Sequence, residues 1–186
     1  GVSTACYVQV IEELARVCAA VAIVLSVHNS VGAYPILRFG SDEQRKNYLP
    51  RLASDWIGAF CLSEAASGSD ASALELRATK DGDSYVLNGA KLWVTNGSIA
   101  NLYLVLAKTA DIPDRPHRGI SAFLVERDTP GITVGKLEDK MGLRASDTAE
   151  IHFQDCRVPA SALVGEEGIG FKIAMQALDN GRIGVG

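Results

Sequence analysis

One short stretch of the sequence has the composition of a ligand-binding loop. FCLSEAASGSD, from Phe60 to Asp70, begins as an apolar strand and ends in eight residues that are all small or acidic. Ser67, Gly68 and Ser69 leave backbone N–H groups open to an anion, and the hydroxyls add donors. Asp70 would repel a phosphate, so we expect its carboxylate to cap the next turn. The loop is a candidate pyrophosphate site, although an ordinary Ser/Gly turn has the same composition.

A second stretch, KLWVTNG from Lys91 to Gly97, could supply one wall of a site for a planar ligand. Along a strand, Trp93 and Thr95 lie on the same face. The indole could pack on a flat ring while the hydroxyl donates a hydrogen bond to it. A tryptophan in a strand is also a common core residue. Together with the serine loop, the pair suggests a dinucleotide-binding site. The ring that meets Trp93 and Thr95 would be neither adenine nor a nicotinamide held in a Rossmann site.

The motifs of several other enzyme classes are absent. The sequence contains no GxGxxG, P-loop, GxSxG or HExxH. Its three scattered histidines suit neither a catalytic triad nor a zinc site: His28, His117 and His152. Its four cysteines form no CxxC pair, which predicts small buried hydrophobes in a reducing compartment: Cys6, Cys18, Cys61 and Cys156. We therefore expect no metal site.

The composition is that of a globular protein. The chain has 186 residues, of which 47% are hydrophobic and 22% charged, with a formal net charge of −4. No basic run interleaves with aromatic residues, so a nucleic-acid partner is not expected. The apolar run Val17–Val27 is too short to cross a bilayer, which predicts a buried helix and no membrane partner. We expect a soluble intracellular protein, from either a mitochondrial matrix or a bacterial cytoplasm.

Helical periodicity marks both ends of the sequence. Apolar residues recur at helical spacing from about Tyr7 to Val31, and Tyr34-Pro35 is expected to end that helix. Ser41 with a glutamine three residues later predicts a capping box for a short helix that ends near Pro50. After Pro159 the glycine-rich run GEEGIG is expected to lead into another helix, and the two acids of this run are expected to interact with the helix N-terminus. The apolar face of that helix is Phe171, Ala174, Met175 and Leu178.

Between Trp56 and Pro159 the pattern is that of strands. Seven short segments follow one another without helices, which predicts an antiparallel β-barrel or sandwich. Within SYVLNGAKLWVT, Asn88-Gly89 indicates the tight turn of a hairpin. The predicted fold class is α+β: residues 1–56 are part of an N-terminal helical domain, 57–160 a middle β domain, and 161–186 the start of a C-terminal helical bundle. Both ends look cut, so we expect a longer natural polypeptide.

Taken together, these stretches resemble the acyl-CoA dehydrogenase family. FCLSEAASGSD is similar to the family signature strand–Ser/Thr–Glu–x–x–x–Gly–Ser–Asp, and LNGAKLWVTNG follows it. The resemblance continues through GISAFLVERDTPGITVGKLEDKMGLRASDTAEIHFQDCRVP and GFKIAMQALDNGRIG, essentially the whole chain, and is nearest to the short-chain and short branched-chain types. Ala65-Ala66 replaces the Pro-Gly of many members, which predicts a slightly less stiff loop.

The resemblance implies FAD, bound in an extended conformation against the middle β domain. It assigns the first stretch to the flavin and its pyrophosphate, and the second to the isoalloxazine, with Thr95 near N5. The cofactor-binding residues so implied are Phe60, Cys61, Leu62, Ser63, Gly68, Ser69, Trp93, Val94 and Thr95. The resemblance also implies that the acyl-CoA substrate contacts Ser69, Asp179 and Arg182.

The implied reaction is α,β-dehydrogenation of an acyl-CoA thioester. Electrons would pass to an electron-transfer flavoprotein, and the full-length protein would be a homotetramer. The family's base is a glutamate, which lies far downstream in most members and just before the arginine of a segment like LDNGR in others. That second position is Gly181, and the acid at Glu64 has no role as base in the family. We therefore expect no catalytic residue within these residues and no turnover by the isolated chain.

Two alternatives stay open at this point. An acyl-CoA oxidase would pass electrons from the reduced flavin directly to oxygen. A non-catalytic flavin- or acyl-CoA-binding protein would explain both Gly181 and the absence of most of a C-terminal helical domain.

Overall fold

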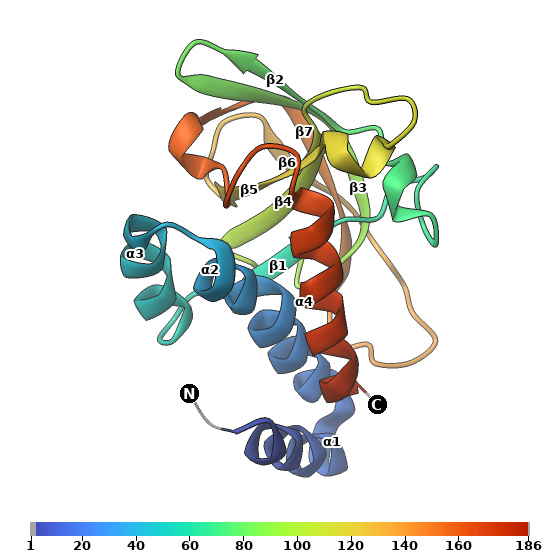
Figure 1. Ribbon diagram of the computed structural model, residues 1–186. Coiled ribbons are helices and arrows are strands. Elements are labelled where there is room, and N and C mark those ends of the chain that lie inside the picture. Colours follow the sequence, from blue (N-terminus) through green and yellow to red (C-terminus); the bar gives the residue numbers. More distant parts are fainter. Residues whose placement is uncertain (1–2, 186) are drawn as a thin grey trace.

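Helices and strands are segregated along the chain in the computed structural model, which describes residues 3–185 (Figure 1). The helical parts are α1 (Thr4–Val27), a π-helical turn (His28–Ala33), α2 (Tyr34–Phe39), α3 (Asp42–Leu52) and α4 (Gly170–Val185). The strands are β1 (Gly58–Cys61), β2 (Arg77–Asp81), β3 (Ser84–Thr95), β4 (Leu102–Lys108), β5 (Ile120–Glu126), β6 (Ile132–Leu137) and β7 (Thr148–Pro159). The predicted α+β class is confirmed.

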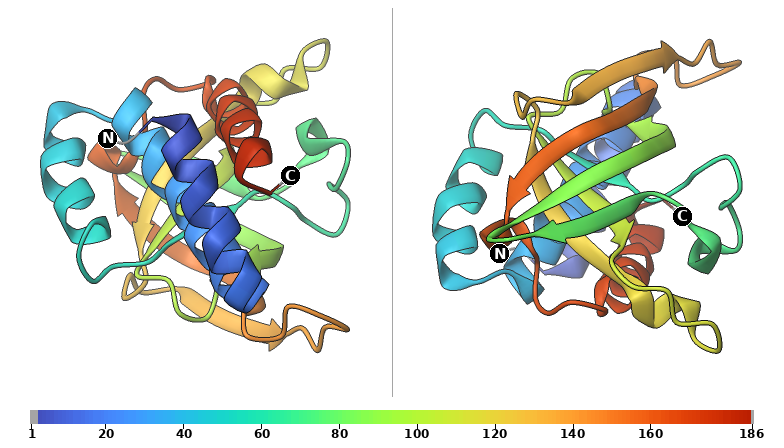
Figure 2. Two further views of the ribbon diagram at one scale, coloured as in Figure 1. Left: turned by 90° about the horizontal axis from the view of Figure 1, so that it is seen from below. Right: turned by 90° about the horizontal axis from the view of Figure 1, so that it is seen from above.

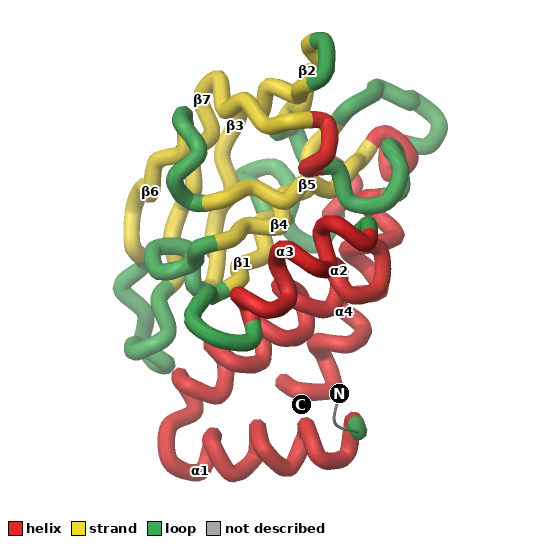
Figure 3. The backbone as a smooth tube through the Cα atoms, turned by 90° about the vertical axis from the view of Figure 1, so that its left-hand side faces the viewer, coloured by secondary structure: helices red, strands yellow, loops and turns green. Residues whose placement is uncertain are grey.

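The first helical segment is longer and more irregular than predicted. Cys18 has non-helical angles (φ −153°, ψ 100°), and α1 changes direction there. The prediction that Tyr34-Pro35 ends the helix is wrong, because the chain passes through the π-helical turn directly into α2. Pro35 lies in the first turn of α2, directly after the π-helical turn, so the helical path continues past the proline. Figure 3 shows that these helices gather on one side of the strands.

The capping box at the start of α3 is confirmed. Ser41 Oγ accepts from the Gln44 N–H at 3.1 Å, and Gln44 Oε1 accepts from the Ser41 N–H at 3.0 Å. The buried Gln44 amide also donates to the carbonyls of Ser161 (2.7 Å) and Leu163 (2.9 Å), which ties α3 to the segment before α4. The expected end near Pro50 is too early by two residues, since Pro50 lies inside the helix.

The seven strands form one curled sheet (Figure 2). Their order is β1-β4-β2-β3-β7-β6, with β5 paired to β4 off this path. Most pairs are antiparallel, as predicted. However, β1 runs parallel to β4 from Gly58↔Leu102 to Cys61↔Val105, so the sheet is mixed. Because helices cover one face, β4 alternates between two cores: Tyr103 and Val105 point into the curl, whereas Leu104 and Leu106 point toward the helices.

The predicted hairpin turn at Asn88-Gly89 is wrong. β3 continues through these residues, and the turn between β2 and β3 is at Gly82-Asp83, where Gly82 has φ +59°. Gly89 (φ +139°) instead lies where the register between β3 and β7 shifts. A Cβ at Gly89 would lie 2.9 Å from Leu76 Cα, so this position needs glycine for a bulge and a close approach.

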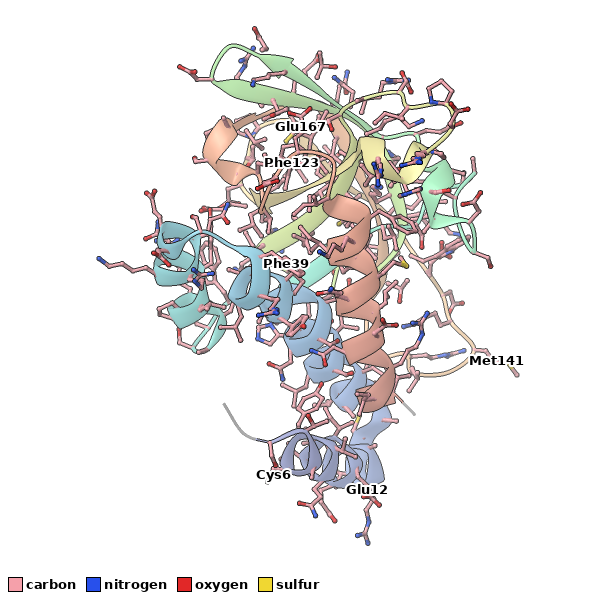
Figure 4. The ribbon with its side chains drawn as sticks, in the orientation of Figure 1. Cys6, Glu12, Phe39, Phe123, Met141 and Glu167 are labelled. Carbon is pink, nitrogen blue, oxygen red and sulfur yellow. The ribbon has the colours of Figure 1, made fainter. Side chains whose placement is uncertain are left out.

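The cysteines are only partly as predicted. Cys61 and Cys156 are buried, and burial raises the pKa of the Cys61 thiol to about 12 and that of Cys156 to about 11. Cys18 is half-buried. Cys6 is exposed at the far end of α1 from the sheet (Figure 4). The expectation of burial fails there because the first half of α1 extends beyond the sheet. Within residues 3–185, no helix is long and apolar enough to cross a membrane.

Candidate functional site

A cavity of about 320 Å³ lies between the helices and one end of the sheet. One wall comes from α1 and the π-helical turn, the second from α4, and the third from the ends of β1 and β3 and the loop after β1. Figure 1 shows α1 and α4 next to each other. The helical lining is Ser26, Val27, Ser30, Val31, Leu178, Gly181, Arg182 and Val185. The strand and loop lining is Phe60, Leu62, Ser63, Leu92, Trp93 and Thr95.

Of the eleven residues implied to bind cofactor or substrate, six line this cavity and five do not. Those on the wall are Phe60, Leu62, Ser63, Trp93, Thr95 and Arg182. Cys61 and Val94 are buried in the core of the curled sheet, because they alternate with wall residues along their strands. Gly68 and Ser69 are exposed on the loop, outside the cavity. Asp179 is exposed too, and it pairs with Arg182 at 2.7 Å.

A bulge places Trp93 on the cavity wall. The register between β3 and β7 shifts between Lys91 and Val94, and Trp93 has φ +54°, which is unusual for a bulky residue. The extra residue lets Leu92, Trp93 and Thr95 all line the cavity, while Lys91 and Val94 turn inward. Trp93 and Thr95 do share a wall, as predicted, but simple strand alternation is not the cause. Trp93 is 57% exposed, so its indole is open to a ligand.

The loop after β1 uses some of its donors internally. Ser67 is buried: its N–H donates to the Glu64 carbonyl at 3.1 Å and its hydroxyl to the Asp70 carbonyl at 2.9 Å. The expectation that Ser67 would present open donors is therefore wrong. The N–H groups of Gly68 and Ser69 and the Ser69 hydroxyl have no partner within residues 3–185. These three donors remain available to an anion.

Asp70 caps the next turn, as predicted. Its carboxylate accepts from the Ser72 N–H at 3.0 Å and from the Ser72 hydroxyl at 2.6 Å. These hydrogen bonds lower the pKa of Asp70. Its negative charge is thereby engaged within the turn.

Glu64 and Lys91 form a buried ion pair behind the cavity. Lys91 Nζ lies 2.6 Å from Glu64 Oε1, and the two side chains are 0% and 6% exposed. The same ammonium donates to the Leu62 carbonyl at 3.0 Å, and the Leu76 N–H donates to the Glu64 carboxylate at 3.1 Å. Burial lowers the pKa of Lys91, and the Glu64 carboxylate opposes that shift. With its oxygens so occupied, Glu64 is not a free base.

Sequence reasoning passed over Lys91. Its only mark in the sequence is that it is the single charged residue of the strand Ser84–Thr95. The partner that explains it, Glu64, is 27 residues earlier in the chain.

The π-helical turn fixes the helical wall against β1. Gly32 and Gly58 approach so closely that a Cβ at Gly32 would lie 3.2 Å from Gly58 Cα. His28 Nδ1 accepts from the Gly58 N–H at 3.1 Å. Burial lowers the pKa of His28, partly opposed by a hydrogen bond with the Leu52 backbone. A π-helical turn is frequent at functional sites, and here it carries Ser30, which sequence reasoning missed, to the cavity wall.

Glu167, one of the two acidic residues before α4, contacts a tyrosine of the β domain, and neither acid lies within the helix. The first turn of α4 contains no acid, because the helix begins only at Gly170. Glu167 accepts a hydrogen bond from the Tyr85 hydroxyl at 3.0 Å, above the start of α4 in Figure 4.

Within residues 3–185, no group of three His, Cys, Asp or Glu side chains could hold a metal ion.

Known proteins match the chain along its whole length. At 50% identity, the chain aligns completely with an acyl-CoA dehydrogenase of Bacillus subtilis and with the mitochondrial short-chain specific acyl-CoA dehydrogenase of Mus musculus. It covers 48% and 45% of those two proteins, so it spans about half the length of the curated relatives it matches.

Two solved structures have nearly the same fold. The butyryl-CoA dehydrogenase of Megasphaera elsdenii superposes with a TM-score of 0.95 at 47% identity, over 99% of this chain and 48% of that one. A chain from a study of the electron transferring flavoprotein of Acidaminococcus fermentans also gives 0.95, at 46% identity and the same coverage.

Family models complete the comparison. The model of the acyl-CoA dehydrogenase N-terminal domain matches residues 1–55, and the model of the middle domain matches residues 59–156. Members of this family are FAD-dependent oxidoreductases. The chain belongs to the acyl-CoA dehydrogenase family.

Proposed function

We propose that the polypeptide containing these residues converts a short or branched acyl-CoA thioester to the enoyl-CoA in an FAD-dependent reaction. The observation that carries the proposal is the cavity itself. It places Trp93 and Thr95 opposite Gly181 and Arg182 of α4, and all four belong to stretches with the family pattern.

The residues present fit FAD. The indole of Trp93 is open, and the Thr95 hydroxyl makes no hydrogen bond within residues 3–185, so a flat, hydrogen-bonding ring could meet both. The unpartnered donors of Gly68 and Ser69 suit a pyrophosphate. When bound, FAD supplies the hydride acceptor. We propose that Phe60, Leu62 and Ser63 line the flavin. Cys61 and Val94 would support this wall from the core of the curled sheet without contacting the flavin.

The helical wall of the cavity supports binding of an acyl group. Half of its residues are apolar: Val27, Val31, Leu178 and Val185. Arg182 lies on the wall with its exposed partner Asp179, where a guanidinium could pair with a phosphate of coenzyme A. We propose Ser69, Asp179 and Arg182 as substrate contacts. The names of the short-chain mouse relative and the butyryl-CoA enzyme support a short acyl chain.

The catalytic base lies outside the described residues in this proposal. Within residues 3–185, no carboxylate lines the cavity, Gly181 has no side chain, and Glu64 is committed to Lys91. We therefore propose that the base belongs to a part of the natural polypeptide beyond these residues. The 186-residue chain alone is expected to bind ligands without turnover.

We propose an electron-transfer flavoprotein as the electron acceptor and a homotetramer as the assembled state. The first is supported by the similarity to a chain described in a study of such a flavoprotein. A mitochondrial matrix or a bacterial cytoplasm is proposed as the location, since relatives of both origins match equally well. The segments 1–56, 57–160 and 161–186 are proposed as parts of three domains.

Anaerobic titration of the natural polypeptide with butanoyl-CoA tests the function. Loss of the oxidised flavin absorbance, followed by turnover with an electron-transfer flavoprotein, is expected. Stoichiometric oxygen consumption during turnover would instead identify an oxidase. Binding of butanoyl-CoA with no loss of flavin absorbance would identify a non-catalytic binding protein.

A further inference from the structure

Lys91 and Glu64 join the two stretches that form the strand side of the cavity. Glu64 follows two wall residues, Leu62 and Ser63, and Lys91 precedes another, Leu92. Lys91 Nζ donates to the Leu62 carbonyl at 3.0 Å and to Glu64 Oε1 at 2.6 Å. Beside them, the Leu92 N–H donates to the Ser63 carbonyl at 2.9 Å. These three hydrogen bonds are direct links between the loop after β1 and β3.

The fold does not require a buried ion pair at this position. Both side chains are almost completely buried, and a buried ion pair is often no more stabilising than an apolar pair of similar volume. Glu64 also accepts from the N–H groups of Glu75 and Leu76, so its carboxylate holds the far end of the loop as well. The location of the pair, directly behind the cavity wall, indicates another role.

The geometry points to Lys91 as a positioning residue for the flavin site. Through the Leu62 carbonyl and Glu64, its ammonium fixes the Leu62–Ser63 wall relative to the Leu92–Trp93 wall. The unusual backbone of Trp93 makes such a constraint necessary, since a residue with φ +54° depends on its surroundings to hold that conformation. This inference rests on the proposed function, in which the two walls meet the isoalloxazine.

Two variants separate the link from the charge. In Lys91→Met/Glu64→Gln, the amide oxygen at position 64 still accepts from the loop N–H groups, but the donor to Leu62 is gone and no lone charge is buried. In Glu64→Gln alone, Lys91 can still donate to the Leu62 carbonyl, although its buried ammonium loses its charged partner and the one amide oxygen cannot accept from both Lys91 and the loop N–H groups. The double variant therefore lacks the side-chain link, whereas the single variant keeps it.

Trp93 itself can report the geometry. The chain has two tryptophans, and Trp56 packs on Tyr48 and Arg51, away from the cavity lining. A background with Trp56→Phe, and with phenylalanine at any tryptophan outside these 186 residues, leaves Trp93 as the single tryptophan, which is excited selectively over tyrosine. Its emission maximum and its quenching by acrylamide are measured without cofactor, and its quenching by added FAD gives the affinity. The natural polypeptide with these substitutions is the protein to use.

The expected result differs between the two variants. Lys91→Met/Glu64→Gln changes the emission and acrylamide quenching of Trp93 and weakens FAD binding on the order of tenfold or more, because the ring meets a displaced wall. Glu64→Gln should keep more FAD affinity than the double variant, since the Lys91–Leu62 hydrogen bond persists, even though the unpaired ammonium lowers the free energy of unfolding. A folded double variant with parent emission and parent FAD affinity would overturn the inference.

Two matched controls exclude general effects. Lys136→Gln/Glu138→Gln removes an exposed Lys–Glu pair with a 2.9 Å separation and should change neither reading. Val158→Ala weakens the same sheet core without touching the link, so it should lower stability and leave the Trp93 readings unchanged. Equal effects of Val158→Ala and the double variant on FAD affinity would assign Lys91 a structural role only.

If the double variant does not fold, the FAD affinity of Lys91→Arg provides the test instead. The charge and the pairing remain, but the longer, planar guanidinium displaces the Leu62 carbonyl, so FAD affinity should still fall. Parent readings for Lys91→Arg would then overturn the inference. If the parent itself binds no FAD, the proposed function fails, whereas the cofactor-free Trp93 readings still test whether Lys91 positions the wall.

Discussion

Gly181 of α4 packs directly on Ser30 of the π-helical turn. A Cβ at position 181 would lie 3.1 Å from Ser30 Oγ and 3.5 Å from Ser30 Cβ. The 3.1 Å distance to Ser30 Oγ is shorter than an ordinary van der Waals contact, whereas the 3.5 Å distance to Ser30 Cβ is within the ordinary range. The α4 wall and the π-helical wall of the cavity therefore contact each other at Gly181 and the Ser30 hydroxyl, where there is little room for a larger side chain.

Gly181→Ala is expected to depend on Ser30. In the parent, the gain in helix propensity of about 1 kcal/mol is offset by the contact with Ser30 Oγ. In a Ser30→Ala background the obstruction is gone, and Gly181→Ala should then stabilise by about 0.5–1 kcal/mol more than in the parent. Urea unfolding of the four proteins in this cycle measures the coupling. Additive effects would show that the contact does not constrain α4.

Gly89→Ala should destabilise the protein far more than Gly82→Ala. Both glycines have positive φ, but a Cβ at Gly89 would lie 2.9 Å from Leu76 Cα, whereas at Gly82 nothing lies within 4 Å. We expect a loss of about 1 kcal/mol for Gly82→Ala and at least about 2–3 kcal/mol for Gly89→Ala. Urea or thermal unfolding of the two variants provides the comparison. Similar losses would mean that the bulge tolerates a side chain.

His28 should make stability fall in mild acid. Its folded-state pKa lies below the unfolded value of 6.5, because burial disfavours the imidazolium and Nδ1 is an acceptor for the Gly58 N–H. Between these two pKa values the unfolded chain binds more protons, so stability rises with pH there. The contribution is complete above about pH 6.5 and is lost as the pH falls toward the folded-state pKa.

Unfolding free energies between about pH 5 and 7.5 check this sign, with His28→Gln as the comparison. His117 and His152 are common to both proteins, so the difference between the two curves reports His28. The parent should lose stability relative to the variant as the pH falls. Parallel curves would contradict the prediction.

Arg182→Ala should affect ligand binding and not stability. The Asp179–Arg182 pair is exposed, with both side chains more than 70% accessible, so its loss should change unfolding by less than about 1 kcal/mol. If Arg182 pairs with a phosphate, coenzyme A thioesters should bind on the order of tenfold more weakly. Isothermal titration with butanoyl-CoA measures this. The exposed Arg16 offers Arg16→Ala as a control, since its helical pair with Glu13 is similar.

Local features of the fold were predictable and distant ones were not. The Ser41–Gln44 capping box and the Asp70 cap depend on residues two or three positions apart, and the structure confirms both. The Asn88-Gly89 turn was wrong because pairing with β7 extends β3 through those residues. The local pattern alone gave no indication that a strand from the other end of the domain would occupy that edge.

The same limit applies to the site. The sequence predicts the stretches that line the cavity, because small residues and an aromatic–hydroxyl pair are themselves chemical features. It does not predict which members face inward. The Trp93 bulge, the Glu64–Lys91 pair and the Ser30–Gly181 contact all depend on segments that meet only in the folded chain.

The neighbours of β3 have a consequence for the order of folding. On one side β3 pairs with β2 through a two-residue turn, and on the other with β7, which ends at Pro159. Local pairings form faster than distant ones, so the β2–β3 hairpin should precede the β3–β7 ladder. The bulge at Trp93 exists only against β7. Amide protection after refolding should therefore reach Val86 before Val94, and the tryptophan wall should be among the last parts of the sheet to mature.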